Sequence, residues 1–227
     1  MEKHVKTLLL GICAGIAIGL GGLLNIVANN LLANIKFLGP IVGSILFPIG
    51  LTLVCFCGFN LFTGKIGYLL DNKKDYWIFL LLVYIGNIIG SLIFGGLCIL
   101  IFSKTNIYPT ALKISNGKLF DLEFVPIMKV FAGSILCGAL VYIAVFCYKS
   151  FNHKWLKVVG IFIPIALFVY LKFDHCIANM FYFAFSWSYG NGISYLNIAI
   201  VTLGNSLGAI FLNEGIKAFK KLTKKDE

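Results

Sequence analysis

The sequence contains no arginine and few charged residues of any kind. Only 12% of its 227 residues are charged, whereas 59% are hydrophobic. Soluble domains carry roughly 25% charged and about 45–50% apolar residues. This balance excludes a soluble globular protein and predicts an integral membrane protein. The basic stretch Lys217–Lys225 suits a cytoplasmic end beside anionic lipid, so we expect a lipid bilayer and no nucleic acid as partner.

Histidine is scarce, and cysteine occurs in the wrong places for a disulfide framework. Of His4, His153 and His175, only the last falls deep in an apolar stretch, so we expect no metal cluster, no cofactor and no enzymatic activity. The seven cysteines lie in or beside apolar runs, where cysteine packs as a small hydrophobe. The pair Cys55 and Cys57 would also fit a metal site, but the packing interpretation is favoured.

Apolar residues gather in six runs. They lie near 7–29, 38–70, 76–102, 124–148, 156–189 and 193–216. Crossing about 30 Å of hydrocarbon takes about 20 residues of helix. We therefore predict an all-α membrane protein of six transmembrane helices, forming a single domain over 1–227. The first run has no small-residue cleavage site and is expected to stay as a span. The longest loop is expected near 103–123.

The lysines are distributed unevenly between the predicted loops. Twelve fall on the side of the N-terminus: Lys3, Lys6, Lys73, Lys74, Lys149, Lys154, Lys157, Lys217, Lys220, Lys221, Lys224 and Lys225. Four fall on the other side: Lys36, Lys104, Lys113 and Lys118. Cytoplasmic loops are enriched in lysine and arginine. We predict a multi-pass protein of the plasma membrane with both termini in the cytoplasm.

Two of the runs are too long for one span and are interrupted at matching places. Each contains a proline, Pro48 or Pro164, and these two prolines stand 116 residues apart. Polar residues then break the apolar pattern at 59–64 and at 173–179. Non-helical backbone at membrane depth is tolerated where it is buried in protein or lines a watery cavity. Both breaks therefore point to one shared cavity.

The span after each break repeats a second pattern. Gly86-Asn87-Ile88-Ile89-Gly90 and Gly204-Asn205-Ser206-Leu207-Gly208 place their asparagines 118 residues apart. The first and fourth runs match more weakly, through Ala14-Gly15 and Ala132-Gly133. Three spans per copy make the second copy enter the membrane from the opposite side. We predict an inverted repeat of 1–110 and 111–227 with interrupted helices 2 and 5, which is the pattern of a transport path.

The second break contains Asp174 and His175, and the first contains Thr63. Ionisable residues inside a membrane are costly and usually face the protein interior or a substrate path. A histidine with a reference pKa near 6.5 can hold or release a proton. We favour a polar contact or proton donor for a solute over a purely structural pair. The Thr63 hydroxyl either donates to a solute or caps the following helix.

Four asparagines accompany the breaks. Asn60 and Asn179 are expected to tie down freed backbone groups, and Asn179 is also placed on the substrate pathway. Asn87 and Asn205 are expected to bond to the broken segments, with solute contact by Asn205 as the further possibility.

Three lysines lie within or beside the spans. Lys129 and Lys172 either extend to the membrane interface or attract anions into a vestibule, and Lys172 directly precedes the second break. Lys65 follows Thr63-Gly64 and is expected to face the cytoplasmic mouth.

These motifs resemble the formate/nitrite transporter family. In that family the second span breaks at Leu-Phe-Thr, matched here by Leu61-Phe62-Thr63. The fifth breaks near Phe-Glu-His-Ser-Ile-Ala-Asn-Met, which reads Phe173-Asp174-His175-Cys176-Ile177-Ala178-Asn179-Met180 in this sequence. The last span carries Val-Thr-Leu-Gly-Asn, matched by residues 201–205. The resemblance covers nearly the whole chain.

The resemblance implies an aquaporin-like fold assembled as a homopentamer, with one pore in each protomer. It implies passage of small monovalent anions of weak acids, such as formate, nitrite and hydrosulfide. It places His175 at the pore centre with Thr63 near it. Apolar constrictions would fall on Leu51, Leu61 and Phe62 toward one mouth and on Phe47 and Phe168 toward the other.

The sequence departs from the family pattern at several positions. Asn60 replaces an acidic residue, Lys172 replaces a glycine, and Gly138 replaces an asparagine of the fourth span. The family's vestibule lysine has no clean match, so Lys113 or Lys118 takes that place.

We hypothesise that lysines at the mouths concentrate the anion and that the apolar rings then favour its neutral, protonated form. His175 would steady the anion or relay the proton. The alternative is an aquaporin-like channel for small neutral solutes. Such a channel should carry Asn-Pro-Ala at each break and an arginine filter, and this sequence has neither.

Overall fold

A computed structural model describes residues 1–223, and over this range the chain forms helices without any β-strand. Lys224 and Lys225, counted above as cytoplasmic, lie outside the described residues. The elements in chain order are α1 (Glu2–Leu31), α2 (Leu38–Leu46), α3 (Pro48–Phe56), α4 (Phe62–Lys65), η1 (Ile66–Asp71), α5 (Tyr76–Phe102), α6 (Ile107–Asn116), α7 (Phe124–Ser150), α8 (Lys154–Tyr170), α9 (Cys176–Phe185), η2 (Ser188–Gly190) and α10 (Gly192–Thr223).

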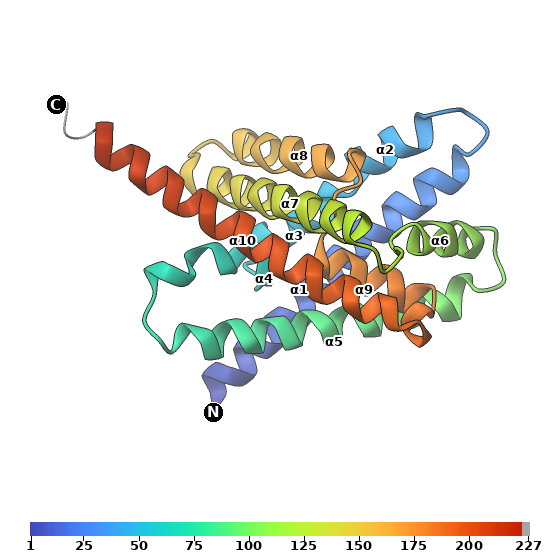
Figure 1. Cartoon of the computed structure of the whole chain (residues 1–227), viewed down its shortest axis with the longest axis horizontal. Helices are drawn as coiled ribbons and strands as arrows, with labels where there is room; N and C mark the ends of the chain where they lie inside the picture. Colours follow the sequence, from blue (N-terminus) through green and yellow to red (C-terminus); the bar gives the residue numbers. More distant parts are fainter. Residues whose placement is uncertain (224–227) are drawn as a thin grey trace.

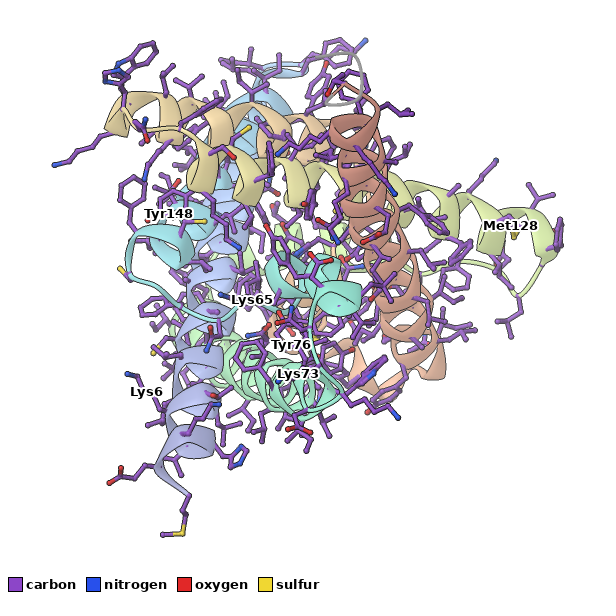
Figure 2. All side chains as sticks on the ribbon, turned by 90° about the vertical axis from the view of Figure 1, so that its left-hand side faces the viewer. Lys6, Lys65, Lys73, Tyr76, Met128 and Tyr148 are labelled. Carbon is purple, nitrogen blue, oxygen red and sulfur yellow. The ribbon has the colours of Figure 1, made fainter. Side chains whose placement is uncertain are left out.

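Five segments of the described chain are long and apolar enough to cross a membrane. They are α1, α2 together with α3, α5, α7 and α10. The fifth predicted run instead forms two shorter helices, α8 and α9. The long helices lie side by side, and the beginning of α1 and the end of α10 lie at the same end of the molecule, with α6 toward the other end (Figure 1). Lys6 and Lys73 lie on the face that carries the chain start (Figure 2).

The segment predicted as the longest loop contains the helix α6. Its turn-forming residues Asn106 and Gly117 stand at the two ends of that helix rather than inside it. Pro109 lies in the first turn, where its missing N–H would have no helical partner anyway. Ala111 and Ser115 lie four residues apart and are buried, because α6 packs against α9 and α1. The prediction of a loop was therefore wrong for this stretch.

Glycines bring two pairs of helices into close backbone contact. A Cβ atom on Gly15 in α1 would overlap the carbonyl group of Asn87 in α5. A Cβ atom on Gly138 in α7 would overlap the carbonyl group of Asn205 in α10. Gly15 therefore corresponds to Gly138, and its predicted pairing with Gly133 was wrong. That pairing relied on a shared dipeptide, whereas the contacts show which residues face the matched asparagines.

The two breaks are offset from the predicted positions. α3 ends at Phe56 and α4 begins at Phe62, while α8 ends at Tyr170 and α9 begins at Cys176. The non-helical stretches are thus 57–61 and 171–175. Thr63 and Asn179, predicted to lie in the breaks, instead belong to the first turns of the helices that follow.

Both breaks open with the same helix-ending turn. The Phe59 N–H donates to the Val54 carbonyl at 2.9 Å, and the Phe173 N–H donates to the Phe168 carbonyl at 2.9 Å. The residue before each phenylalanine is left-handed, with φ of 70° at Gly58 and 59° at Lys172. This is the Schellman arrangement, in which glycine is favoured at the left-handed position.

Lys172→Gly is therefore expected to stabilise the protein by about 1 kcal/mol, because a side chain in the left-handed conformation costs roughly that much. Thermal unfolding in detergent should show the increase. Gly58→Ala is the matched opposite change: no atom lies within 4 Å of a Cβ built there, so its cost comes from the backbone conformation alone. Lower stability of Lys172→Gly would contradict this account of the turn.

Candidate functional site

The carboxamide of Asn87 completes the hydrogen bonding of the first break. Its Oδ1 accepts from the Phe62 N–H at 2.9 Å, and this group is the first of α4. Its Nδ2 donates to the Asn60 carbonyl at 2.9 Å and to the Gly11 carbonyl at 2.8 Å. Asn87 is fully buried. One side chain on α5 thus joins both sides of the break to α1.

Asn205 does the same for the second break. Its Oδ1 accepts from the Cys176 N–H at 2.9 Å, and its Nδ2 donates to the carbonyls of Asp174 at 2.9 Å and Ser134 at 2.8 Å. The prediction that Asn87 and Asn205 bond to the broken segments is confirmed. Both amide hydrogens of Asn205 are engaged by backbone carbonyls, so the geometry favours a holding role over solute contact.

The two breaks meet at Thr63 and His175. The Thr63 Oγ1 lies 2.8 Å from the His175 Nε2. Exposed fractions of 0% and 2% show that both side chains are inside the protein. Thr63 does not cap α4, whose N-cap residue is Leu61. Its hydroxyl instead joins the first half of the chain to the second.

The backbone fixes the tautomer of His175. Its Nδ1 accepts a hydrogen bond from the Ala178 N–H at 3.2 Å, as the N-cap of α9. A nitrogen that accepts carries no hydrogen, so the neutral ring has its hydrogen on Nε2. Nε2–H then donates to Thr63 Oγ1, and the hydroxyl hydrogen of Thr63 stays free to donate elsewhere.

A small apolar cavity adjoins His175. Its lining consists of Ile18, Phe47, Leu51, Leu61, Val141, Ile165, Phe168 and His175. The free space of about 10 Å³ is close to what one water molecule needs. The ring of Phe168 stacks on His175 with 5.9 Å between centroids and meets Phe47 edge-on at 5.8 Å. The cavity is therefore apolar except at the imidazole.

Four of the five residues predicted to form constrictions line this one cavity, although the resemblance had divided them between two mouths. The fifth, Phe62, does not line it and packs against Tyr84 with 4.8 Å between ring centroids. At the C-terminal end of α4, the Lys65 carbonyl accepts a hydrogen bond from the Tyr76 hydroxyl at 3.0 Å, and both residues lie near the centre of the view in Figure 2.

Among the lysines considered from the sequence, Lys118 reaches the site. Its Nζ lies 2.7 Å from the Oδ1 of Asp174, and the two side chains are 15% and 12% exposed. Lys113, Lys129 and Lys172 are exposed and form no salt bridge with the residues described. Lys118 lies two residues after the end of α6, so recognising that helix in the sequence would have favoured Lys118 over Lys113.

Asn179 binds side chains rather than the freed backbone groups predicted for it. Its Nδ2 donates to the Asp174 Oδ1 at 2.9 Å and to the Asn197 Oδ1 at 2.8 Å. Asn197 was not identified from the sequence. The available signal was a second asparagine in the last span, eight residues before Asn205. Within residues 1–223 no group of three or more His, Cys, Asp and Glu side chains is arranged to hold a metal ion.

Comparison with known proteins agrees with this architecture. Residues 2–219 match the model of the formate/nitrite transporter family. The uncharacterized transporter YrhG of Bacillus subtilis is 34% identical over 96% of this chain and 86% of its own. The nitrite transporter NirC of Escherichia coli is 31% identical over 89% and 79%. A pentameric formate channel with formate bound superposes with a TM-score of 0.79 at 24% identity, covering 100% of this chain and 99% of its own.

Replacing either asparagine that holds a break should be severely destabilising. Asn205→Leu has a similar volume but leaves two buried backbone groups of the break, the Cys176 N–H and the Asp174 carbonyl, without this partner, each costing about 1–3 kcal/mol. We expect little folded protein in size-exclusion chromatography of the solubilised variant. Asn87→Leu should behave alike. Ser206→Ala on the same helix is the control, because its hydroxyl bonds only to the Thr202 carbonyl of its own helix. Normal yield of Asn205→Leu would contradict the holding role.

Proposed function

The chain belongs to the formate/nitrite transporter family, and from that premise we propose that it carries small monovalent anions of weak acids, such as formate, nitrite or hydrosulfide, across the plasma membrane. The observation that carries the proposal is the contact between Thr63 and His175, where the two breaks converge beside an apolar cavity. The His175 Nε2–H and the Thr63 hydroxyl thus supply two hydrogen-bond donors beside a cavity whose other lining residues are apolar.

The apolar lining selects for solutes that can become neutral. A bare anion placed among Phe47, Leu51, Leu61 and Phe168 loses its hydration without gaining partners, which costs several kcal/mol or more. A weak-acid anion avoids much of this cost by taking up a proton before it enters. Chloride, the anion of a strong acid, has no such route and is excluded.

His175 serves this passage as a neutral hydrogen-bond donor. Its Nε2–H and the free hydroxyl hydrogen of Thr63 can both turn to a solute oxygen or sulfur. A second ring proton would sit on Nδ1, facing the Ala178 N–H and breaking the N-cap of α9. Steadying the solute is therefore favoured over relaying its proton through the ring.

The matched contacts support two inverted copies, 1–110 and 111–227, that together cross the membrane six times. Asn87 and Asn205 make equivalent hydrogen bonds, and Gly58 and Lys172 occupy equivalent turns. The uneven lysine distribution favours cytoplasmic termini. A homopentamer follows the pentameric formate channel that the chain resembles, with lipid or neighbouring protomers covering the exposed apolar faces.

Formate uptake into proteoliposomes should rise as the external pH falls. As long as the pH is above the pKa of the acid, each unit by which the pH falls raises the neutral-acid fraction up to about tenfold. A flux limited by that fraction should rise by the same factor. Stopped-flow measurements with formate, nitrite and hydrosulfide would rank the substrates. Chloride and glycerol are the controls: chloride flux equal to formate flux, or glycerol flux without formate flux, would overturn the proposal.

Thr63→Val should lower formate flux about tenfold, because an isosteric side chain removes one hydrogen-bond donor from the pathway and leaves the His175 Nε2–H unpartnered. Thr63→Ser keeps the hydroxyl and should retain most of the flux. Both are measured per folded oligomer at one pH. Equal flux in the two variants would show that the hydroxyl does not contact the solute.

A further inference from the structure

Four residues form a closed ring of hydrogen bonds beside His175, through their side chains and one backbone carbonyl. Lys118 Nζ donates to Asp174 Oδ1 at 2.7 Å, and Asn179 Nδ2 donates to the same oxygen at 2.9 Å. Asn179 Nδ2 also donates to Asn197 Oδ1 at 2.8 Å, and Asn197 Nδ2 donates to the Lys118 carbonyl at 3.0 Å. Asn179 and Asn197 are fully buried. The ring thus begins and ends at Lys118.

The Lys118 carbonyl sets the orientation of both carboxamides. A carbonyl only accepts, so it must face the Nδ2 of Asn197, which turns the Oδ1 of Asn197 toward Asn179. That oxygen in turn requires the Nδ2 of Asn179. Turning either amide over would place oxygen against oxygen. The orientation is therefore fixed by the hydrogen-bond pattern rather than by the shape of the side chains.

This orientation leaves one acceptor without a partner. Within the described residues, Asn179 Oδ1 is the buried side-chain atom that has no hydrogen-bond partner. The Nδ2 of the same side chain donates one hydrogen to Asp174 and the other to Asn197. A buried acceptor without a hydrogen bond costs about 1–3 kcal/mol of stability. A small donor that binds to this oxygen would remove that cost.

We propose that Asn197 is a positioning residue that locks Lys118, Asp174 and Asn179 together and thereby presents Asn179 Oδ1 as the acceptor for the acidic hydrogen of the protonated solute. This rests on the proposed function. The ring adjoins the apolar cavity through His175, which lines the cavity and whose carbonyl accepts from the Asn179 N–H at 2.9 Å. In this scheme Lys118 attracts the anion and Asn179 Oδ1 accepts from the neutral acid. Asn197 stands eight residues before Asn205 on α10. One helix therefore holds both the backbone of the second break and the side chains around it.

Asn197→Leu removes both hydrogen bonds with little change in volume. We expect the KM for formate to rise about fivefold while maximal flux per folded oligomer changes little, the loss being that of about one hydrogen bond. Asn179→Ala should raise the KM by a similar factor. The double variant should be no worse than either single one, because Asn197 acts through Asn179. Asn197→Ser keeps one hydroxyl, so its KM for formate should fall between those of Asn197→Leu and the unchanged protein. This variant provides the test if Asn197→Leu does not fold.

Asn213→Leu is the matched control. Asn213 is a buried asparagine on α10, about 24 Å further along the helix axis. It accepts from the Tyr142 hydroxyl at 2.6 Å and donates to Asp71 at 3.1 Å, away from the ring. Its removal should lower stability without changing the KM. Adding Asn213→Leu to Asn179→Ala should leave the KM of Asn179→Ala unchanged.

A second measurement does not depend on the substrate. In Asn197→Leu, the Lys118 amine should react several-fold faster with a water-soluble acylating reagent, followed by mass spectrometry of the peptides. Lys113, exposed on α6, should react at an unchanged rate. If the unchanged protein transports no weak acid, the proposed function fails while this measurement still tests the positioning role.

Three results would overturn the inference. An unchanged formate KM in Asn179→Ala would mean that a fixed water satisfies Asn179 Oδ1. Effects of Asn197→Leu and Asn179→Ala that multiply in the double variant would mean that they act independently. An unchanged rate of Lys118 acylation in Asn197→Leu would mean that Asn197 does not hold Lys118.

Discussion

The structure depends on two carboxamides that replace the hydrogen bonds a broken helix gives up. Backbone groups at membrane depth have no water to bond to, so an interrupted span needs a partner from within the protein. Asn87 and Asn205 each supply one acceptor and two donors and use all three. Because both breaks are held in this way, the short helices α4 and α9 begin where Thr63 can meet His175.

Much of this scaffold could be predicted from the sequence because its signals are local and occur twice. The paired prolines, the interrupted apolar runs and the asparagines 118 residues apart indicated two breaks and named the residues that hold them. The start of each break was missed by two residues. Gly58 signals a left-handed turn by its residue type, whereas Lys172 adopts the same conformation without any such signal.

The side chains around Asp174 could not be placed from the sequence. Lys118 reaches Asp174 across 56 residues of chain, and it does so because α6 intervenes where a loop was expected. Asn197 became recognisable only through its partners, since a single asparagine in an apolar span has no fixed spacing to a lysine or an amide elsewhere. Contacts between distant elements decide such roles, and residue type alone does not.

The two breaks share their pattern of hydrogen bonds but not the side chains at their meeting point. When the breaks are aligned, His175 corresponds to Leu61 and Thr63 corresponds to Ile177, so each polar residue at the meeting point has an apolar counterpart. Leu61 and His175 line the same cavity, which therefore has one imidazole in an apolar lining instead of two. The Lys118 and Asp174 pair also lies at the second break alone among the described residues. The side of the cavity toward α6 thus carries a cation and a carboxylate. At the first break the charged residue is Lys65, at the end of α4, so the two breaks differ in charge although their hydrogen bonding is alike.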